Sequence, residues 1–148
     1  MSTPEYDNDN IFAKILRGEI PCFKIYEDEH VLAFMDIMPR GEGHSLVIPK
    51  EPCRNMLDAS PEAVAHVHKT AQKVALAAMK AFNADGITIQ QFSEDASGQE
   101  VYHYHVHVVP RHEGKKFGAA NVMGDMEEIK ANGEKLAAAL GELKLNGG

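Results

Sequence analysis

The chain has 148 residues, which suits one domain with a single buried core. Its composition, 44% hydrophobic and 25% charged, is ordinary, and a formal net charge of −7 argues against broad attraction to nucleic acid or anionic membranes. The first residues are polar and acidic, and no stretch approaches the roughly 18 apolar residues of a membrane helix. With two isolated cysteines, the sequence is typical of a cytoplasmic protein with reduced thiols.

The first expected element is a short helix over residues 11–19, which Asn10 or Asp9 can cap. Three runs rich in branched and aromatic residues follow, separated first by an acidic turn and then by a glycine-rich connection. Such runs predict strands of an antiparallel sheet. They cover residues 22–28, 30–36 and 44–50.

The middle of the chain predicts a long alanine-rich helix over residues 60–82, with Ser60 as its N-cap and Pro61 at its first position. A fourth strand is expected over residues 86–92. A fifth strand is expected within residues 98–111, which contain three histidines.

The end of the chain, residues 124–144, predicts a C-terminal helix that Asn132 and Gly133 weaken. The expected fold class is therefore α+β. It has a five-stranded antiparallel sheet, one short helix, one long helix and a C-terminal helix.

The fifth strand carries the strongest functional signal, in the stretch GQEVYHYHVHVVPR. Successive strand side chains point to opposite faces, so His103, His105 and His107 are expected to line one face. The intervening tyrosines and valines form an apolar row suited to a core, and Pro110 is expected to end the strand. The other four lone histidines are interpreted as structural: His30, His66, His68 and His112.

Three crowded imidazoles stay largely neutral near pH 7, because protonated rings would repel one another. Neutral imidazoles can bind zinc or another borderline metal. Alternatively, one ring attacks a phosphorus atom while its neighbours orient it, protonate the leaving group and bind the phosphoryl oxygens. We expect neither a Cys pair nor a nearby carboxylate to complete a metal shell, but the residues alone leave both chemistries open.

The motif HYHVHVV matches the His-φ-His-φ-His-φ-φ signature, and the chain resembles the histidine triad, or HIT, superfamily of nucleotide hydrolases and transferases. The match extends to NIFAKILRGEIP and VLAFMDIMPRGEGHSLVIPK, in the order and approximate spacing of Hint-like and Fhit-like members. The resemblance implies a HIT-like fold with a HIT domain over residues 10–112. A flexible segment, 1–9, would precede it, and an extension, 113–148, would belong to the same domain.

The resemblance implies that His105, the middle histidine, attacks the α-phosphate and forms a nucleotidyl-imidazole intermediate that water hydrolyses. His103 and His107 would orient the nucleophile and contact the phosphate or the leaving group. His44 matches the fourth active-site histidine of the family. Taken alone, His44 is equally well explained as a hydrogen-bonding residue at a strand end.

Further residues match substrate-binding positions of the family. Asp36 would accept hydrogen bonds from the ribose hydroxyls, and Gln99 would lie near the phosphates and leaving group. Ser93 stands in the loop before the triad, where close relatives often have Asn, and its shorter side chain leaves one ribose or phosphate contact to water. The slot for the base would be formed by Ile11, Phe12, Ile15, Phe34 and Ile37; without the resemblance these five would simply be core residues.

Besides Ser93, three positions depart from the family pattern. Glu100 stands where relatives usually have Ser or Thr. Strict alternation along a strand would turn its carboxylate away from the phosphates, whereas a bulge, which is common at a strand entrance, would let it reach the pocket and repel a phosphate. Asn10 and Ala13 occupy the positions of a Cys pair in zinc-containing relatives. We therefore expect no structural zinc and no cofactor.

The resemblance implies a nucleotidyl hydrolase or transferase that acts on nucleoside 5′-phosphoric derivatives, with purine nucleoside phosphoramidates favoured. Three alternatives stay open: a dinucleoside polyphosphate hydrolase, a metal-dependent hydrolase and a non-catalytic nucleotide-binding regulator. The expected partners are a purine nucleotide substrate and a second copy of the chain in a homodimer. We expect the protein to bind neither nucleic acid nor membranes.

Overall fold

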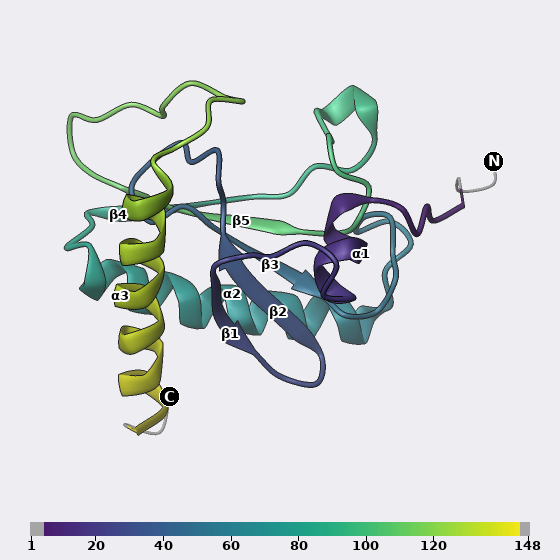
Figure 1. Cartoon of the computed structure of the whole chain (residues 1–148), viewed down its shortest axis with the longest axis horizontal. Coiled ribbons are helices and arrows are strands. Elements are labelled where there is room, and N and C mark those ends of the chain that lie inside the picture. Colours follow the sequence, from purple (N-terminus) through teal and green to yellow (C-terminus); the bar gives the residue numbers. More distant parts are fainter. Residues whose placement is uncertain (1–4, 146–148) are drawn as a thin grey trace.

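A computed structural model describes residues 5–145 of the chain. Five strands form one antiparallel sheet in the order β1-β2-β3-β5-β4 (Figure 1). This confirms the predicted α+β class and its five-stranded antiparallel sheet. The strands are β1 (Lys24–Glu27), β2 (Val31–Met35), β3 (Ser45–Pro49), β4 (Gly86–Gln90) and β5 (Val106–Arg111).

Three α-helices accompany the sheet: α1 (Ile11–Leu16), α2 (Pro61–Ala81) and α3 (Met126–Leu145). The predicted caps of the first two are confirmed. The side chain of Asn10 accepts the N–H of Ala13 at 2.9 Å, and the hydroxyl of Ser60 accepts the N–H of Ala63 at 3.0 Å. Within residues 5–145, no helix is long and apolar enough to cross a membrane.

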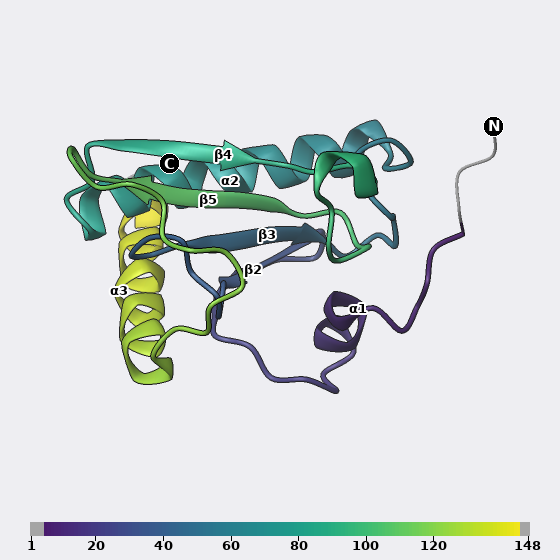
Figure 2. The same cartoon turned by 90° about the horizontal axis from the view of Figure 1, so that it is seen from above.

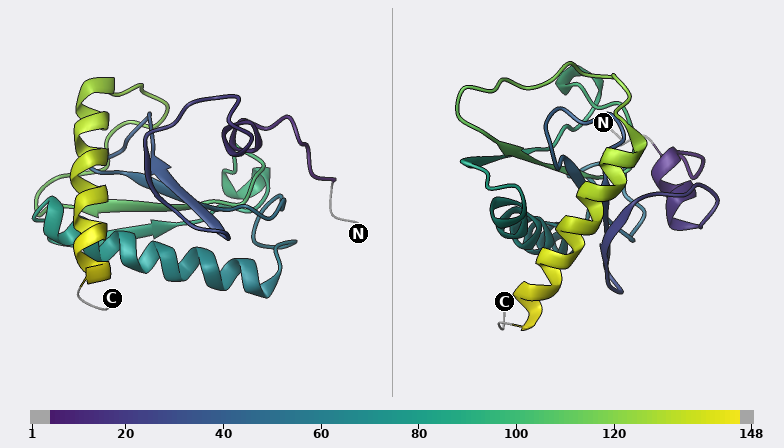
Figure 3. Two further views of the ribbon diagram at one scale, coloured as in Figure 1. Left: turned by 60° about the horizontal axis from the view of Figure 1, so that its bottom comes forward. Right: turned by 60° about the vertical axis from the view of Figure 1, so that its left-hand side comes forward.

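The two faces of the sheet are covered differently, as Figure 2 shows. Helices α2 and α3 pack against one face and cross each other at its end (Figure 3). They bury a large apolar core there that includes Val47, Val106 and Val108 of the sheet and Val67 of α2. Full burial of one such side chain stabilises the fold by about 1.5–3 kcal/mol. The opposite face carries the small helix α1, which leaves room for a pocket.

Helix α3 runs through Gly133 without interruption, so the predicted weak point does not break it. A Cβ atom at Gly133 would lie 3.1 Å from Cγ of Met35, a contact tighter than side chains normally make. The glycine therefore allows α3 to approach β2 closely. This packing compensates for the low helix propensity of glycine.

The fifth strand was expected to include all three histidines of residues 98–111 and to end at Pro110, and both of these bounds are wrong. β5 begins at Val106, so His103 and His105 precede it, and it continues through Pro110 to Arg111. Pro110 pairs with β4, whereas the pairing with β3 covers only residues 106–108. At Pro110 the strand therefore has a neighbour on one side only, and a missing N–H is tolerated at such a position.

Candidate active site

A pocket of about 300 Å³ lies between α1, the ends of β2 and β3, the start of β5 and the loops around residues 98–101 and 120–121. Its lining is mostly apolar and suits a flat ring. The structure brings together in this lining all five residues predicted for the base slot: Ile11, Phe12, Ile15, Phe34 and Ile37. Phe12 also contacts His105 edge to face, with 4.9 Å between ring centroids.

His105 and His103 are held by hydrogen bonds that determine where each ring carries its proton. A carbonyl oxygen only accepts, so Nδ1 of His105, 2.6 Å from the carbonyl oxygen of His103, carries a proton. In the neutral ring, Nε2 of His105 therefore keeps a lone pair. Nε2 of His103 likewise donates to the carbonyl oxygen of Pro49 at 2.8 Å, which leaves Nδ1 of His103 as an acceptor.

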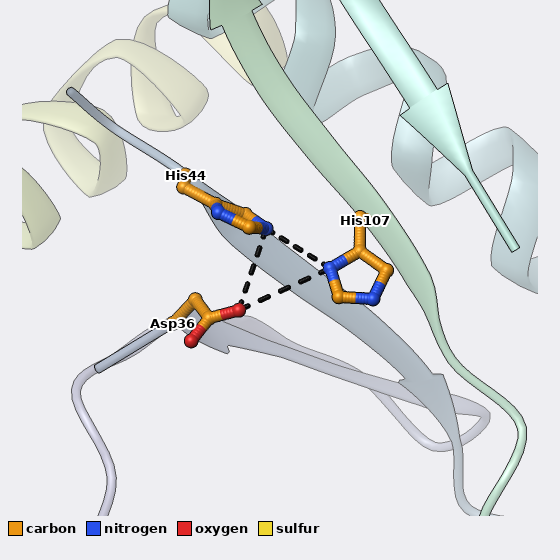
Figure 4. A group of neighbouring side chains, drawn as sticks. All are labelled: Asp36, His44 and His107. Atoms are coloured by element: carbon orange, nitrogen blue, oxygen red, sulfur yellow. Dashed lines mark hydrogen bonds and ion pairs between the residues drawn. The ribbon is translucent and has the colours of Figure 1, made fainter. Parts of the chain in front are cut away.

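His44, His107 and Asp36 form a second cluster, drawn in Figure 4. The N–H of Arg40 donates to Nδ1 of His44 at 3.0 Å, so the proton of neutral His44 is on Nε2. Nε2 of His44 donates to Nδ1 of His107 at 2.9 Å and lies 3.4 Å from Oδ2 of Asp36. His107 then carries its own proton on Nε2, ready to donate.

The prediction that no carboxylate lies near the triad is wrong, because Asp36 reaches His44 and His107. Their three ligand atoms are close enough together to hold a metal ion. A metal-binding histidine, however, normally donates the N–H of its other nitrogen to an acceptor. His44 does the reverse, because its Nδ1 receives the N–H of Arg40 and its proton lies at the centre of the cluster. The observed hydrogen bonds favour a proton relay over a metal centre.

Burial keeps the four histidines neutral. Desolvation lowers the pKa of His44 and His103 to about 4 and that of His107 to about 3, and it also lowers the pKa of His105. The pKa of Asp36 is raised to about 6, chiefly by burial, although the N–H of Met38 opposes the rise. Neutral imidazoles are nucleophiles and hydrogen-bond donors at pH 7.

Two predicted substrate residues do not line this pocket. Gln99 is buried, and its side chain makes four hydrogen bonds, to Asn55, to the N–H of Glu94 and to the carbonyl oxygens of Arg54 and Val101. These bonds stabilise the loop that precedes the three histidines. The hydroxyl of Ser93 donates to the side chain of Gln91 at 3.1 Å.

Glu100 lines the pocket and is exposed, so the structure agrees with the second of the two orientations expected from the sequence. Residue 100 precedes β5, and strand alternation does not apply there. Among the described residues, the charged side chains that line the pocket are Asp36, Arg40 and Glu100. The guanidinium of Arg40 is directed to the carbonyl oxygen of Gly118, at 3.0 Å. Acidic side chains therefore outnumber basic ones around the site.

Three residues of the site were not predicted from the sequence. Arg40 positions His44 through its main chain, and its only signal was its place in the glycine-rich connection. Phe92 lies edge to face with His107, at 5.8 Å between ring centroids, and was visible only as the end of an apolar run. Tyr6 donates to His103, 97 residues away, and nothing in the sequence signalled that contact.

The chain is similar to known proteins in sequence and in fold. The family model described as "HIT domain" matches residues 17–114. A solved structure of a Hit-like protein from Bartonella henselae is 52% identical, with a TM-score of 0.88 over 92% of this chain and 99% of that one.

Two curated relatives are similar over most of their length. "Protein hit" of Bacillus subtilis is 42% identical over 110 residues, which are 74% of this chain and 76% of that protein. Adenosine 5′-monophosphoramidase hnt1 of Schizosaccharomyces pombe is 36% identical over 133 residues, which are 88% of this chain and 97% of that protein.

Proposed function

The chain belongs to the HIT family, and from this membership we propose that it is a nucleotidyl hydrolase or transferase in which His105 attacks the α-phosphate of a nucleoside 5′-phosphoric derivative. One observation carries the proposal. The bond from Nδ1 of His105 to the carbonyl oxygen of His103 leaves the lone pair on Nε2, in a side chain that lines an apolar slot.

In the first step, Nε2 of His105 forms a bond to the α-phosphorus as the bond to the leaving group breaks. The phosphate is anionic and favours a protonated imidazole beside it, so His107 takes up a proton from solvent when the substrate binds. The added proton occupies Nδ1 of His107 and faces Oδ2 of Asp36, 3.9 Å away. The N–H of His44 then donates to the same oxygen, 3.4 Å away, instead of to His107. His107 then gives its Nε2 proton to the leaving group.

In the second step, neutral His107 takes a proton from water, whose oxygen attacks the phosphorus. The bond between phosphorus and Nε2 breaks, and the nucleoside monophosphate and free His105 are released. His107 returns its extra proton to solvent, and His44 again donates to its Nδ1 through the 2.9 Å bond that holds the ring in place. His103 holds His105 through its carbonyl oxygen. Asp36 also has the two oxygens needed to bind the ribose diol.

Purine nucleoside phosphoramidates are the proposed substrates. A dinucleoside polyphosphate would bring several negative charges toward Glu100, and no lysine lines the described part of the pocket. An amine leaving group carries no negative charge and avoids this repulsion. The similarity to the Schizosaccharomyces pombe phosphoramidase supports the same choice.

The test is to incubate the purified protein with an adenosine phosphoramidate, an aminoacyl adenylate and a dinucleoside polyphosphate, each with and without chelator. We expect the phosphoramidate to be cleaved fastest, to nucleoside monophosphate and amine, with or without chelator. Faster cleavage of the polyphosphate would favour the polyphosphate hydrolase. Activity restored only by zinc would favour a metal-dependent enzyme, and nucleotide binding without turnover would favour a regulator.

We also propose a homodimer in the cytoplasm. Strand β4 is at the edge of the described sheet, and Ile89 on β4 and Leu76 and Met79 on the adjacent α2 are exposed. Exposed apolar side chains beside an open strand edge are typical of an interface. The free thiols of Cys22 and Cys53 fit a reducing compartment. Light scattering and cell fractionation test the two proposals.

A further inference from the structure

His103 is completely buried, and both of its ring nitrogens make hydrogen bonds inside the protein. Nε2 donates to the carbonyl oxygen of Pro49, and the main-chain N–H of the next residue, Tyr104, donates to the carbonyl oxygen of Cys53 at 2.9 Å. These two bonds attach the chain just before the nucleophile to residues 49–53. The ring of His103 is therefore one of the fixed points from which His105 is placed.

The second nitrogen of that ring, Nδ1, is bonded to the phenol of Tyr6 at 2.6 Å. Since Nδ1 carries the lone pair, the phenol is the donor. The two rings also meet edge to face, with 5.6 Å between their centroids. Tyr6 precedes α1 and lies outside residues 17–114, which the family model matches.

The segment that carries Tyr6 is itself attached to α1. The main-chain N–H and the side-chain amide of Asn10 both donate to the carbonyl oxygen of Asp7, at 3.3 and 2.7 Å. Arg17 donates to the carbonyl oxygen of Asn8 at 2.8 Å. These bonds attach the segment that carries Tyr6 to α1 and its flanking residues.

We propose that Tyr6 is a positioning residue for the nucleophile, which holds His103 in the tautomer that donates from Nε2 and thereby fixes the carbonyl oxygen that orients His105. This inference rests on the proposed role of His105. Tyr6 does not line the pocket, so it acts through His103 and leaves substrate binding to other residues.

Removal of the phenol would leave the ring of His103 with an unmet hydrogen-bonding need. Nδ1 of His103 would become a buried acceptor without a donor, which costs about 1–3 kcal/mol. The ring would relieve this by moving its proton to Nδ1 or by turning, and either change breaks the bond to Pro49. The carbonyl oxygen of His103 would shift with it, and a misplacement of about 1 Å near a reacting group can slow a reaction about a hundredfold.

The test compares Tyr6→Phe with Tyr26→Phe. Tyr26 lies on β1, and its phenol donates to Asp28 at 2.8 Å, so each variant loses the hydrogen bond that its phenol donates. Steady-state kinetics with an adenosine phosphoramidate give kcat and KM. Long-range ¹H–¹⁵N correlation spectra of ¹⁵N-labelled protein report which nitrogen of each histidine carries the proton, and thermal unfolding reports the stability of both variants.

We expect Tyr6→Phe to lower kcat about tenfold with KM changed less than about twofold. In the spectrum of this variant, the ¹⁵N chemical shift of Nδ1 of His103 should no longer be that of a hydrogen-bonded acceptor. The chemical shifts of the His105 ring nitrogens should also change. Tyr26→Phe should leave kcat and these signals unchanged. Unchanged histidine signals in Tyr6→Phe, or an equal loss of kcat in both variants, would overturn the proposal. Should the wild type cleave no substrate, the proposed function fails while the spectra still decide the role of Tyr6.

Discussion

The carbonyl oxygen of His103 accepts a hydrogen bond from Nδ1 of His105, the residue two positions later, across 2.6 Å. This bond assigns the two nitrogens of His105 different tasks. Nδ1 orients the ring, and Nε2 keeps the lone pair that a nucleophile needs. Because the acceptor is a main-chain atom, it is preserved in any substitution of the His103 side chain that leaves the loop in place.

Replacement of His105, the proposed nucleophile, should separate chemistry from binding. His105→Asn is expected to abolish turnover while binding of a nucleoside monophosphate stays within about tenfold, because the apolar slot and Asp36 hold the ligand. Isothermal titration calorimetry and product analysis measure the two effects. A comparable loss of both would show that His105 serves binding rather than chemistry.

Neutralising the acid at the pocket should change the preference for leaving groups. Glu100→Gln removes a negative charge from the lining of the pocket. For a dinucleoside polyphosphate, kcat/KM should rise roughly five- to thirtyfold, which corresponds to about 1–2 kcal/mol of transition-state stabilisation. The gain for an amine leaving group should be smaller. Glu113→Gln, an exposed acid outside the pocket lining, is the matched control. A fall in kcat/KM with intact folding would instead indicate that the carboxylate binds the leaving group.

Chelation should leave the activity intact. The N–H of Arg40 holds the proton of His44 on Nε2, at the point where His107 and Asp36 converge, so the cluster is arranged around a proton. Activity after exhaustive dialysis against a chelator is expected to stay within about twofold of the untreated protein. Loss of activity that zinc restores would contradict this interpretation of the cluster.

The folded protein should lose stability below neutral pH. Burial lowers the pKa of His44 and His103 to about 4 and that of His107 to about 3, so the unfolded chain, with histidine pKa values of about 6.5, binds more protons between these values. Their contribution is complete above about pH 6.5 and is lost as the pH falls. Asp36 opposes this, because its raised pKa of about 6 favours the folded state at low pH.

The loss of stability from the three histidines is larger than the gain from the single carboxyl group of Asp36. We expect urea unfolding to give a free energy of unfolding roughly 2–5 kcal/mol lower at pH 5 than at pH 7.5. A free energy that is constant or rises between pH 7.5 and pH 5 would show that the histidines are already protonated in the folded protein.

The sequence predicted the elements of the fold because local signals and packing agree in them. Asn10 and Ser60 cap their helices, and the apolar residues 106 and 108 alternate toward the core, as expected. The start of β5 was not predictable from alternation. His103 is held by Pro49 and Tyr6, residues distant in sequence, rather than by a strand neighbour.

For a similar reason, the sequence predicted the site residues on helices and strands better than those in loops. Side chains on regular elements, such as Phe12 and Phe34, line the pocket as expected. Loop residues depend on long-range hydrogen bonds that no local pattern encodes. Gln99 is bound by its own loop and by Asn55, and Glu100 lines the pocket because it precedes the strand.

A covalent bond between the α-phosphate and His105 can be detected from the stereochemical course of the reaction at phosphorus. A phosphoramidate of adenosine 5′-phosphorothioate with one configuration at phosphorus is hydrolysed in ¹⁸O-labelled water, and the configuration of the product is determined by ³¹P NMR. Attack by His105 and then by water gives two in-line displacements, each of which inverts the phosphorus. The account therefore predicts overall retention of configuration. Overall inversion would show that water attacks the substrate directly and would contradict the covalent intermediate.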